Sequence, residues 1–241
     1  MDRVTRKELK GDKFAEEVFD IFDWASEHKT EVLRYGAVVL AVILIAVGVV
    51  FYRRTQAENR EEALAQAFRI EDSVIGDSPN PTALHFATQD EKDKAQTKAY
   101  TDLATKYSGT LEGAFGSFAL ASDALGKGNL AEAEKRYREV ADSGPKPSAD
   151  MARLALSSVL TSEGKTAEAQ KLLQELVNNP GLTVSKEEAN LALAQLMAKN
   201  DPAAALKVLD PLRTSPRGPV SRVAVTEYGQ IDQAANLLKK K

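Results

Sequence analysis

The hydrophobic positions of the chain form one unbroken run, residues 35–52, and then recur with helical spacing along a much longer region. The run has eighteen residues without a charge, Asn, Gln or Pro, and eleven of them are Val, Ile, Leu or Phe. A helix of that length measures about 27 Å at about 1.5 Å per residue, close to the thickness of a bilayer's hydrocarbon core. The pattern therefore predicts a membrane-spanning helix.

Two other interpretations of this run fit less well. A cleaved signal peptide has a short basic start, an apolar stretch of about 7–15 residues and a small-residue cleavage site. Here 34 residues precede the run, and Arg53 and Arg54 follow it without an A-x-A pattern. A buried core helix would be shorter or would keep a polar stripe. We therefore expect an uncleaved anchor.

The segment before the run is amphipathic. One helical face carries the large apolar residues Phe14, Val18, Ile21 and Phe22, and the opposite face is acidic. A helix that lies on anionic lipid carries Lys and Arg on its polar face. The four apolar residues are therefore candidate contacts to a partner protein, and a plain solvated helix before the membrane is the alternative.

After the run the helical spacing continues to Val74 and Ile75, where a Gly- and Pro-rich segment, residues 76–81, stops it. A second helix is predicted to begin at Thr88, because Glu91 three residues later completes a capping box.

The chain then repeats itself with a period of 36 residues. The repeating segments share a turn residue, a small residue near the start of the helix and a large apolar residue four positions later. The turn residues are Gly128, Gly164 and Asn200; the small residues are Ala133, Ala169 and Ala205; the large residues are Tyr137, Leu173 and Leu209. Another apolar helix precedes each segment, over residues 111–125, 149–160 and 186–198, with Ser148 and Ser185 as candidate N-caps.

Helix packing explains this pattern. Two antiparallel helices approach closely only where small side chains lie at their crossing, and a large apolar residue one turn later fills the cleft to the next unit. The turn needs a residue that accepts a left-handed conformation, which Gly128, Gly164 and Asn200 are expected to supply. Such hairpins cannot bury their apolar faces alone, so they are expected to stack.

These residues resemble the tetratricopeptide repeat. The period is 36 instead of 34, and Ser117, Ala121 and Ala124 stand where the family has Trp, Gly and Tyr. We predict an all-α fold, a single transmembrane helix followed by a tetratricopeptide-like helical-hairpin solenoid. The expected parts are an amphipathic tail (1–34), the transmembrane helix (35–52), a connecting helix and loop (53–88) and the repeat domain (89–241).

Charge and composition narrow the range of possible functions. Residues 53–241 carry 25 basic and 26 acidic side chains, a net charge of −1, which argues against nucleic acid as a partner. The chain has no Cys, and its two histidines, His28 and His85, lie on opposite sides of the predicted span. With no phosphate-binding loop or paired catalytic carboxylates recognisable, we expect a non-enzymatic protein without catalytic residues, metal or cofactor.

The distribution of Lys and Arg gives the orientation only weakly. The 34 residues before the span hold seven of them, and the first twenty after it hold four, which favours a cytoplasmic N-terminus. Within twenty residues of the span, however, the count is two against four.

The layout resembles YfgM-like ancillary subunits of the Sec translocon. The resemblance rests on IFDW at residues 21–24, the span, the Tyr52-Arg53-Arg54 opening of the next helix, and residues 103–137. It implies a single-pass protein of the bacterial inner membrane with a cytoplasmic N-terminus and periplasmic repeats. The implied partners are the translocon, a membrane-anchored periplasmic prolyl isomerase or other chaperone, and unfolded exported chains. The alternative is a scaffold for cell division, outer-membrane assembly or cytochrome maturation.

The first helices of such repeats line a concave face. By register, its apolar candidates for client binding are Phe118, Leu125, Met151, Leu154 and Met197, and Phe115, Ser122 and Ala194 are expected on the same face. A surface with Met and without Lys or Arg suits contact with many different apolar segments. The alternative is that part of this set is ordinary core between helices.

Overall fold

The computed structural model describes residues 24, 27–76 and 83–238. The chain divides into two compact units, Met1–Asn59 and Arg60–Lys241, and each is described by itself. The candidate partner contacts of the tail, Phe14, Val18, Ile21 and Phe22, lie outside the described residues.

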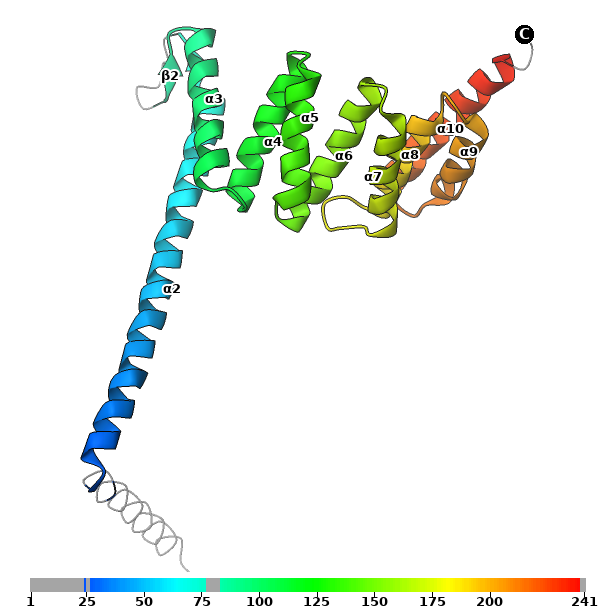
Figure 1. Cartoon of the computed structure of the whole chain (residues 1–241). Coiled ribbons are helices and arrows are strands. Elements are labelled where there is room, and N and C mark those ends of the chain that lie inside the picture. The colour runs from blue at the N-terminus through cyan, green and yellow to red at the C-terminus, as the bar shows by residue number, and fades with distance from the viewer. Residues whose placement is uncertain (1–23, 25–26, 77–82, 239–241) are drawn as a thin grey trace, which may run out of the picture. The chain divides into compact units, whose positions relative to one another are not determined.

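Helix α2, Lys29–Glu71, contains the apolar run (Figure 1). It is long and apolar enough to cross a membrane, and none of its most apolar window is buried inside the protein. A core helix would be mostly buried, so the interpretation of the run as a core helix is wrong. Close to the start of α2, the ring of Trp24 stacks on that of His28 with centroids 4.9 Å apart.

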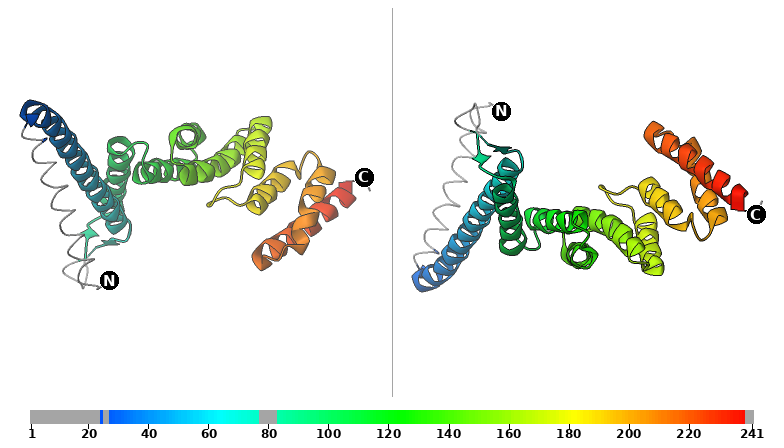
Figure 2. Two further views of the ribbon diagram at one scale, coloured as in Figure 1. Left: turned by 90° about the horizontal axis from the view of Figure 1, so that it is seen from below. Right: turned by 90° about the horizontal axis from the view of Figure 1, so that it is seen from above.

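The second unit is a row of antiparallel helices, each packed against the next along the chain (Figures 1 and 2). After the last turns of α2 they are α3 (Gln89–Lys106), α4 (Leu111–Gly126), α5 (Leu130–Ser143), α6 (Lys146–Ser162), α7 (Thr166–Asn178), α8 (Lys186–Met197), α9 (Pro202–Leu209), a 3₁₀ helix (Asp210–Thr214) and α10 (Gly218–Leu238). This is the predicted helical-hairpin fold.

The turn between α2 and α3 differs from the prediction. Helix α2 ends at Glu71, and Val74 and Ile75 form strand β1 (Val74–Ile75), which pairs in parallel with β2 (His85–Phe86). The hydroxyl of Ser73 donates to the Ile70 carbonyl oxygen at 2.6 Å, which competes with continuation of the helix.

Two of the predicted N-caps are confirmed and one is wrong. The hydroxyls of Thr88 and Ser185 accept from the backbone N–H groups of Glu91 and Glu188 at 3.2 Å. Ser148 lies inside α6, which begins at Lys146 because a proline in its first turn has no N–H group to satisfy.

The turns between paired helices adopt two different backbone conformations. Gly128 and Gly164 have φ angles of 76° and 77°, the left-handed conformation expected. Asn200 does not adopt it, since no described residue other than glycine has a positive φ. Instead, the N–H groups of Asn200 and Asp201 both donate to the Met197 carbonyl oxygen, and the Asp201 side chain caps α9 by accepting from Ala204 N–H at 2.9 Å.

The residues that define the repeat form the core. Ala133, Ala169 and Ala205 have no exposed surface, and the large residues four positions later, Tyr137, Leu173 and Leu209, are also buried. The central cluster of buried residues joins α4 to α8, and a C-terminal cluster joins α8, α9 and α10.

A third cluster lies at the N-terminal end of the row. Ala67 of α2 is fully buried against Tyr100 and Leu103 of α3 and Leu120 of α4. The rings of Phe68 and Phe115 also meet, with centroids 5.1 Å apart. The last turns of α2 and helix α3 therefore form a further hairpin that the sequence pattern did not assign to the repeats.

Candidate protein-interaction surface

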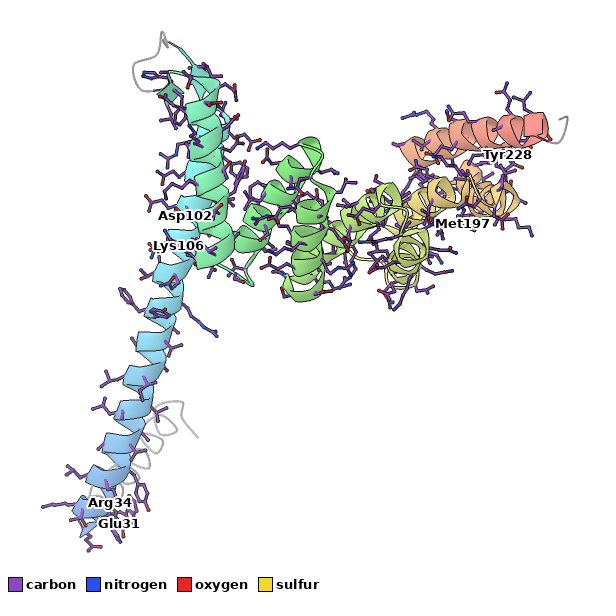
Figure 3. All side chains as sticks on the ribbon, turned by 45° about the horizontal axis from the view of Figure 1, so that its top comes forward. Glu31, Arg34, Asp102, Lys106, Met197 and Tyr228 are labelled. Carbon is purple, nitrogen blue, oxygen red and sulfur yellow. The ribbon has the colours of Figure 1, made fainter. Side chains whose placement is uncertain are left out.

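The five predicted client residues lie on the first helices α4, α6 and α8, at different depths. Leu125 and Met151 are exposed, at 36% and 44%. Phe118, Leu154 and Met197 are half-buried against the central cluster. Met197, labelled in Figure 3, also contacts the C-terminal cluster. Only Leu125 and Met151 of this set present an open apolar surface.

Packing between repeats explains why part of the face is closed. The Phe118 ring meets Tyr137 of α5 edge-on with centroids 5.0 Å apart, and the Tyr137 hydroxyl lies 2.8 Å from Ser122 Oγ. Ala194, expected on the open face, is fully buried in the C-terminal cluster. The expectation that Ala194 lies on the open face is therefore wrong, because this side chain packs in one cluster with residues of α9 and α10, which come later in the chain.

An open cleft lies between α2, α3 and α4, and we call it the α2–α3–α4 cleft. Its volume is about 320 Å³. Its apolar part includes Tyr100, Phe115, Ala119 and Leu120, and Ser122 also lines it. Phe115 and Ser122 were both expected on the first-helix face, but the cleft itself was not predicted because α2 and α3 were not recognised as a hairpin.

Charged side chains surround this cleft. Glu71, Asp93, Asp123 and Lys127 line it, and Lys127 Nζ lies 2.7 Å from Asp123 Oδ2. That hydrogen bond raises the pKa of Lys127, and Asp93 adds to the effect. The cleft wall is thus rich in carboxylates.

Tyr100 connects α3 to the end of α2 in the wall of the cleft. Its hydroxyl donates to Glu71 Oε2 at 2.9 Å and accepts from Gln96 Nε2 at 3.1 Å. Burial is the largest cause that raises the pKa of Tyr100, and the neighbouring Glu71 carboxylate acts in the same direction. The phenol therefore stays protonated and keeps donating to Glu71.

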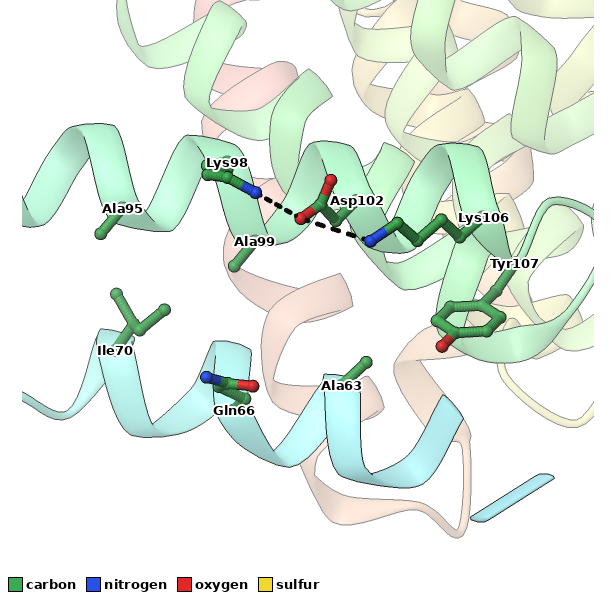
Figure 4. Close-up of a pocket in the computed structure, with 9 residues that line it drawn as sticks. All are labelled: Ala63, Gln66, Ile70, Ala95, Lys98, Ala99, Asp102, Lys106 and Tyr107. Atoms are coloured by element: carbon green, nitrogen blue, oxygen red, sulfur yellow. Dashed lines mark hydrogen bonds and ion pairs between the residues drawn. The ribbon is translucent and has the colours of Figure 1, made fainter. Parts of the chain in front are cut away.

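A second depression, the α2–α3 furrow, has a volume of about 370 Å³. Its floor contains Ala63, Ala95 and Ala99. Figure 4 shows Lys98, Asp102 and Lys106 in a row along α3 beside it, with ammonium-to-carboxylate distances of 2.7 and 3.8 Å. The hydrogen bond from Lys98 is the largest cause of the lowered pKa of Asp102.

An ionic network joins the second helices of the first two repeats. Glu134 of α5 accepts from Lys165 Nζ and from Arg138 Nη2, both at 2.7 Å, and Arg138 also reaches Glu168 of α7 at 2.8 Å. These cations hold the pKa of Glu134 at about 2, below its usual 4.5. The network joins α5 to the N-cap and first turn of α7, and none of its residues lines the cleft.

Among residues 24, 27–76 and 83–238, no group of three or more His, Asp or Glu side chains is placed to hold a metal ion. His28 belongs to the first unit and His85 to the second. His85 Nδ1 lies 3.3 Å from the Ala83 carbonyl oxygen, an exposed local contact.

The stacked hairpins, crossing alanines and glycine turns define a helical repeat scaffold, a class that is typically non-enzymatic and presents surfaces to other proteins. The model of the tetratricopeptide repeat-like domain family matches residues 24–182, and the chain belongs to that family. Neither the curated proteins nor the solved structures contain a match to this chain. The matched range ends before α8, yet α8 and α9 keep the 36-residue spacing and bury Ala205 in the same way.

Proposed function

We propose that this protein is a membrane-anchored scaffold that serves as an ancillary subunit of the Sec translocon and links exported chains to periplasmic chaperones. The observation that carries the proposal is that α2 contains both the apolar segment and a residue of the repeat core. One helix holds an apolar segment with no side chain buried in the protein and, further along, Ala67, which is fully buried in the first hairpin. A repeat protein built onto its own anchor suits work beside a membrane-embedded complex.

The proposed topology places the N-terminus in the cytoplasm and the repeats in the periplasm of a bacterial inner membrane. The count of Lys and Arg over the whole tail and the resemblance to YfgM-like subunits support it. A reporter active only in the periplasm, fused after Lys241, is expected to be active. Activity of a cytoplasmic reporter at that position instead would overturn the topology and the function together.

The proposed partners are the translocon, a membrane-anchored prolyl isomerase or another periplasmic chaperone, and unfolded exported chains. Three contacts are proposed: the apolar residues that the sequence predicts on one face of the tail, the span and the repeats. Weak contacts to one complex reinforce one another through effective concentration when all can engage together.

Co-purification in mild detergent tests this function. We expect the full chain to recover translocon subunits, and the triple change Phe14→Ser, Ile21→Ser and Phe22→Ser to lower that recovery while membrane insertion is retained. The matched control changes to Ser the acidic residues that the sequence predicts on the opposite face, Glu16, Asp20 and Asp23. Recovery of division or outer-membrane assembly factors without translocon would contradict the proposal.

A further inference from the structure

The α2–α3–α4 cleft combines an apolar floor with an excess of negative charge. Phe115 and Ala119 are partly exposed and supply its accessible apolar surface, and Tyr100 and Leu120, each 7% exposed, pack behind them. Its charged residues are three carboxylates, Glu71, Asp93 and Asp123, and one ammonium group, Lys127, which gives a net charge of −2. Its volume of about 320 Å³ lies at the small end of ligand-binding pockets, enough for one or two side chains.

Lys127 shows how the cleft holds a cation. Its ammonium group lies 2.7 Å from Asp123 Oδ2, and Asp93 also stabilises its charge. The side chain of Lys127 is 64% exposed, so this ion pair is weak and easily exchanged. A second cation entering the cleft would compete with Lys127 for the same carboxylates.

We propose that this cleft binds a segment of an unfolded polypeptide in which a Lys or Arg stands next to an aromatic or large aliphatic residue. The apolar side chain lies against Phe115 and Ala119, and the cation lies between Asp93 and Asp123. The inference rests on the proposed function, because it names the chemical class of exported segment that the scaffold takes.

The structure predicts effects of opposite sign for two neighbouring residues. Asp123→Asn removes a charge that attracts the cation and should weaken binding about two- to fivefold, the range of an exposed ion pair. Lys127→Gln removes the competing cation and should tighten binding by a similar factor. Both shifts should shrink at high ionic strength.

The α2–α3 furrow supplies a matched control. Asp102 accepts from Lys98 Nζ at 2.7 Å beside the furrow (Figure 4). Asp123 accepts from Lys127 in the same way, but Asp102 does not line the α2–α3–α4 cleft. Asp102→Asn should therefore leave the affinity unchanged. Ala119→Leu should fill the cleft and weaken binding, and circular dichroism checks that this variant keeps its helicity.

The experiment measures fluorescence anisotropy of labelled unfolded peptides with the full chain in nanodiscs. One peptide carries Lys-Phe and Arg-Leu pairs, and the other has Glu at each cationic position. We expect the cationic peptide to bind more tightly, with the opposite shifts for the Asp123 and Lys127 variants.

Equal effects of Asp123→Asn and Asp102→Asn, weaker binding after Lys127→Gln, or no preference between the peptides would overturn the assignment of the cleft. Such a result would leave translocon co-purification intact, so it differs from failure of the proposed function. Failure of that function would appear as loss of the translocon while the peptide preference persists.

Discussion

The second and third repeats share the 36-residue spacing. They differ in the turn between their two helices and in the length of the second helix. Gly164, at a φ of 77°, joins α6 to an α7 of 13 residues. In the third repeat no left-handed residue is used, and α9 has only 8 residues. Both repeats nevertheless bury their crossing alanine completely. The small residue at the crossing, and not the turn, therefore sets the register of the stack.

The short α9 shows that the repeat spacing is kept although its second helix ends early. Pro211 cannot supply the N–H group that an α-helix would need there, and the chain tightens into a 3₁₀ helix at Asp210. Leu212, the counterpart of Leu176, is still buried, with 7% exposed against 2%. The position of the apolar side chain is kept although the helix type changes.

The largest expected effect comes from the feature that both repeats share. Ala169→Leu should overpack the crossing and lower the free energy of unfolding by about 1–3 kcal/mol, measured by urea denaturation of the full chain in detergent. The control is Glu168→Leu, which loses only the exposed ion pair with Arg138 and should cost about 0–1 kcal/mol. Equal small effects would mean that the register is misassigned.

The turns should respond differently to the same substitution. Gly164→Ala forces a side chain into the left-handed region and should cost about 1–2 kcal/mol. Nothing lies within 4 Å of the added Cβ, so the cost is conformational. Asn200→Ala should change the free energy of unfolding by less than about 0.5 kcal/mol. Denaturation curves with similar shifts for both variants would remove the distinction between the two turns.

Removing the N-cap of α9 in the third repeat should by itself lower the free energy of unfolding. Asp201→Ala leaves the N–H group of Ala204 without its 2.9 Å acceptor and should cost about 1 kcal/mol. Lys199→Ala, at an exposed position just before the turn, is the control and should be nearly neutral. A neutral Asp201 variant would show that the turn holds without its cap.

The smallest effect concerns the ionic network of the first two repeats. The pKa of Glu134 is about 2 in the folded chain and near 4.5 when unfolded, so its contribution is complete above about pH 4.5 and is lost as the pH falls toward 2. The parent should therefore lose more stability over that interval than Glu134→Gln, by at most about 1 kcal/mol. Parallel pH profiles for the two proteins would contradict this role.

The repeat architecture could be predicted because its signals are local. The spacing of Ala133, Ala169 and Ala205 and the glycines before the first two follow directly from helix crossing and turn geometry, and the structure buries all three alanines. The caps Thr88 and Ser185 are equally local. Ser148 was misassigned because α6 already begins at Lys146, with Pro145 as its N-cap and Pro147 in its first turn.

The α2–α3–α4 cleft could not be predicted because it depends on contacts far apart in the sequence. Tyr100 and Glu71 are 29 positions apart, and their hydrogen bond forms only when α2 turns back onto α3. No 36-residue signal marks this hairpin. Exposure on the first-helix face likewise depends on the neighbouring units, as Ala194 shows.

The most direct test of the account is photo-crosslinking in intact cells, with a photoreactive residue at one of two positions of the full chain. Met151 lies exposed on the first helix α6, and Lys171 lies exposed on the second helix α7. The account predicts adducts with exported chains and translocon subunits from position 151 and far fewer from position 171. Equal yields at both positions, or adducts only with division or outer-membrane assembly factors, would contradict it.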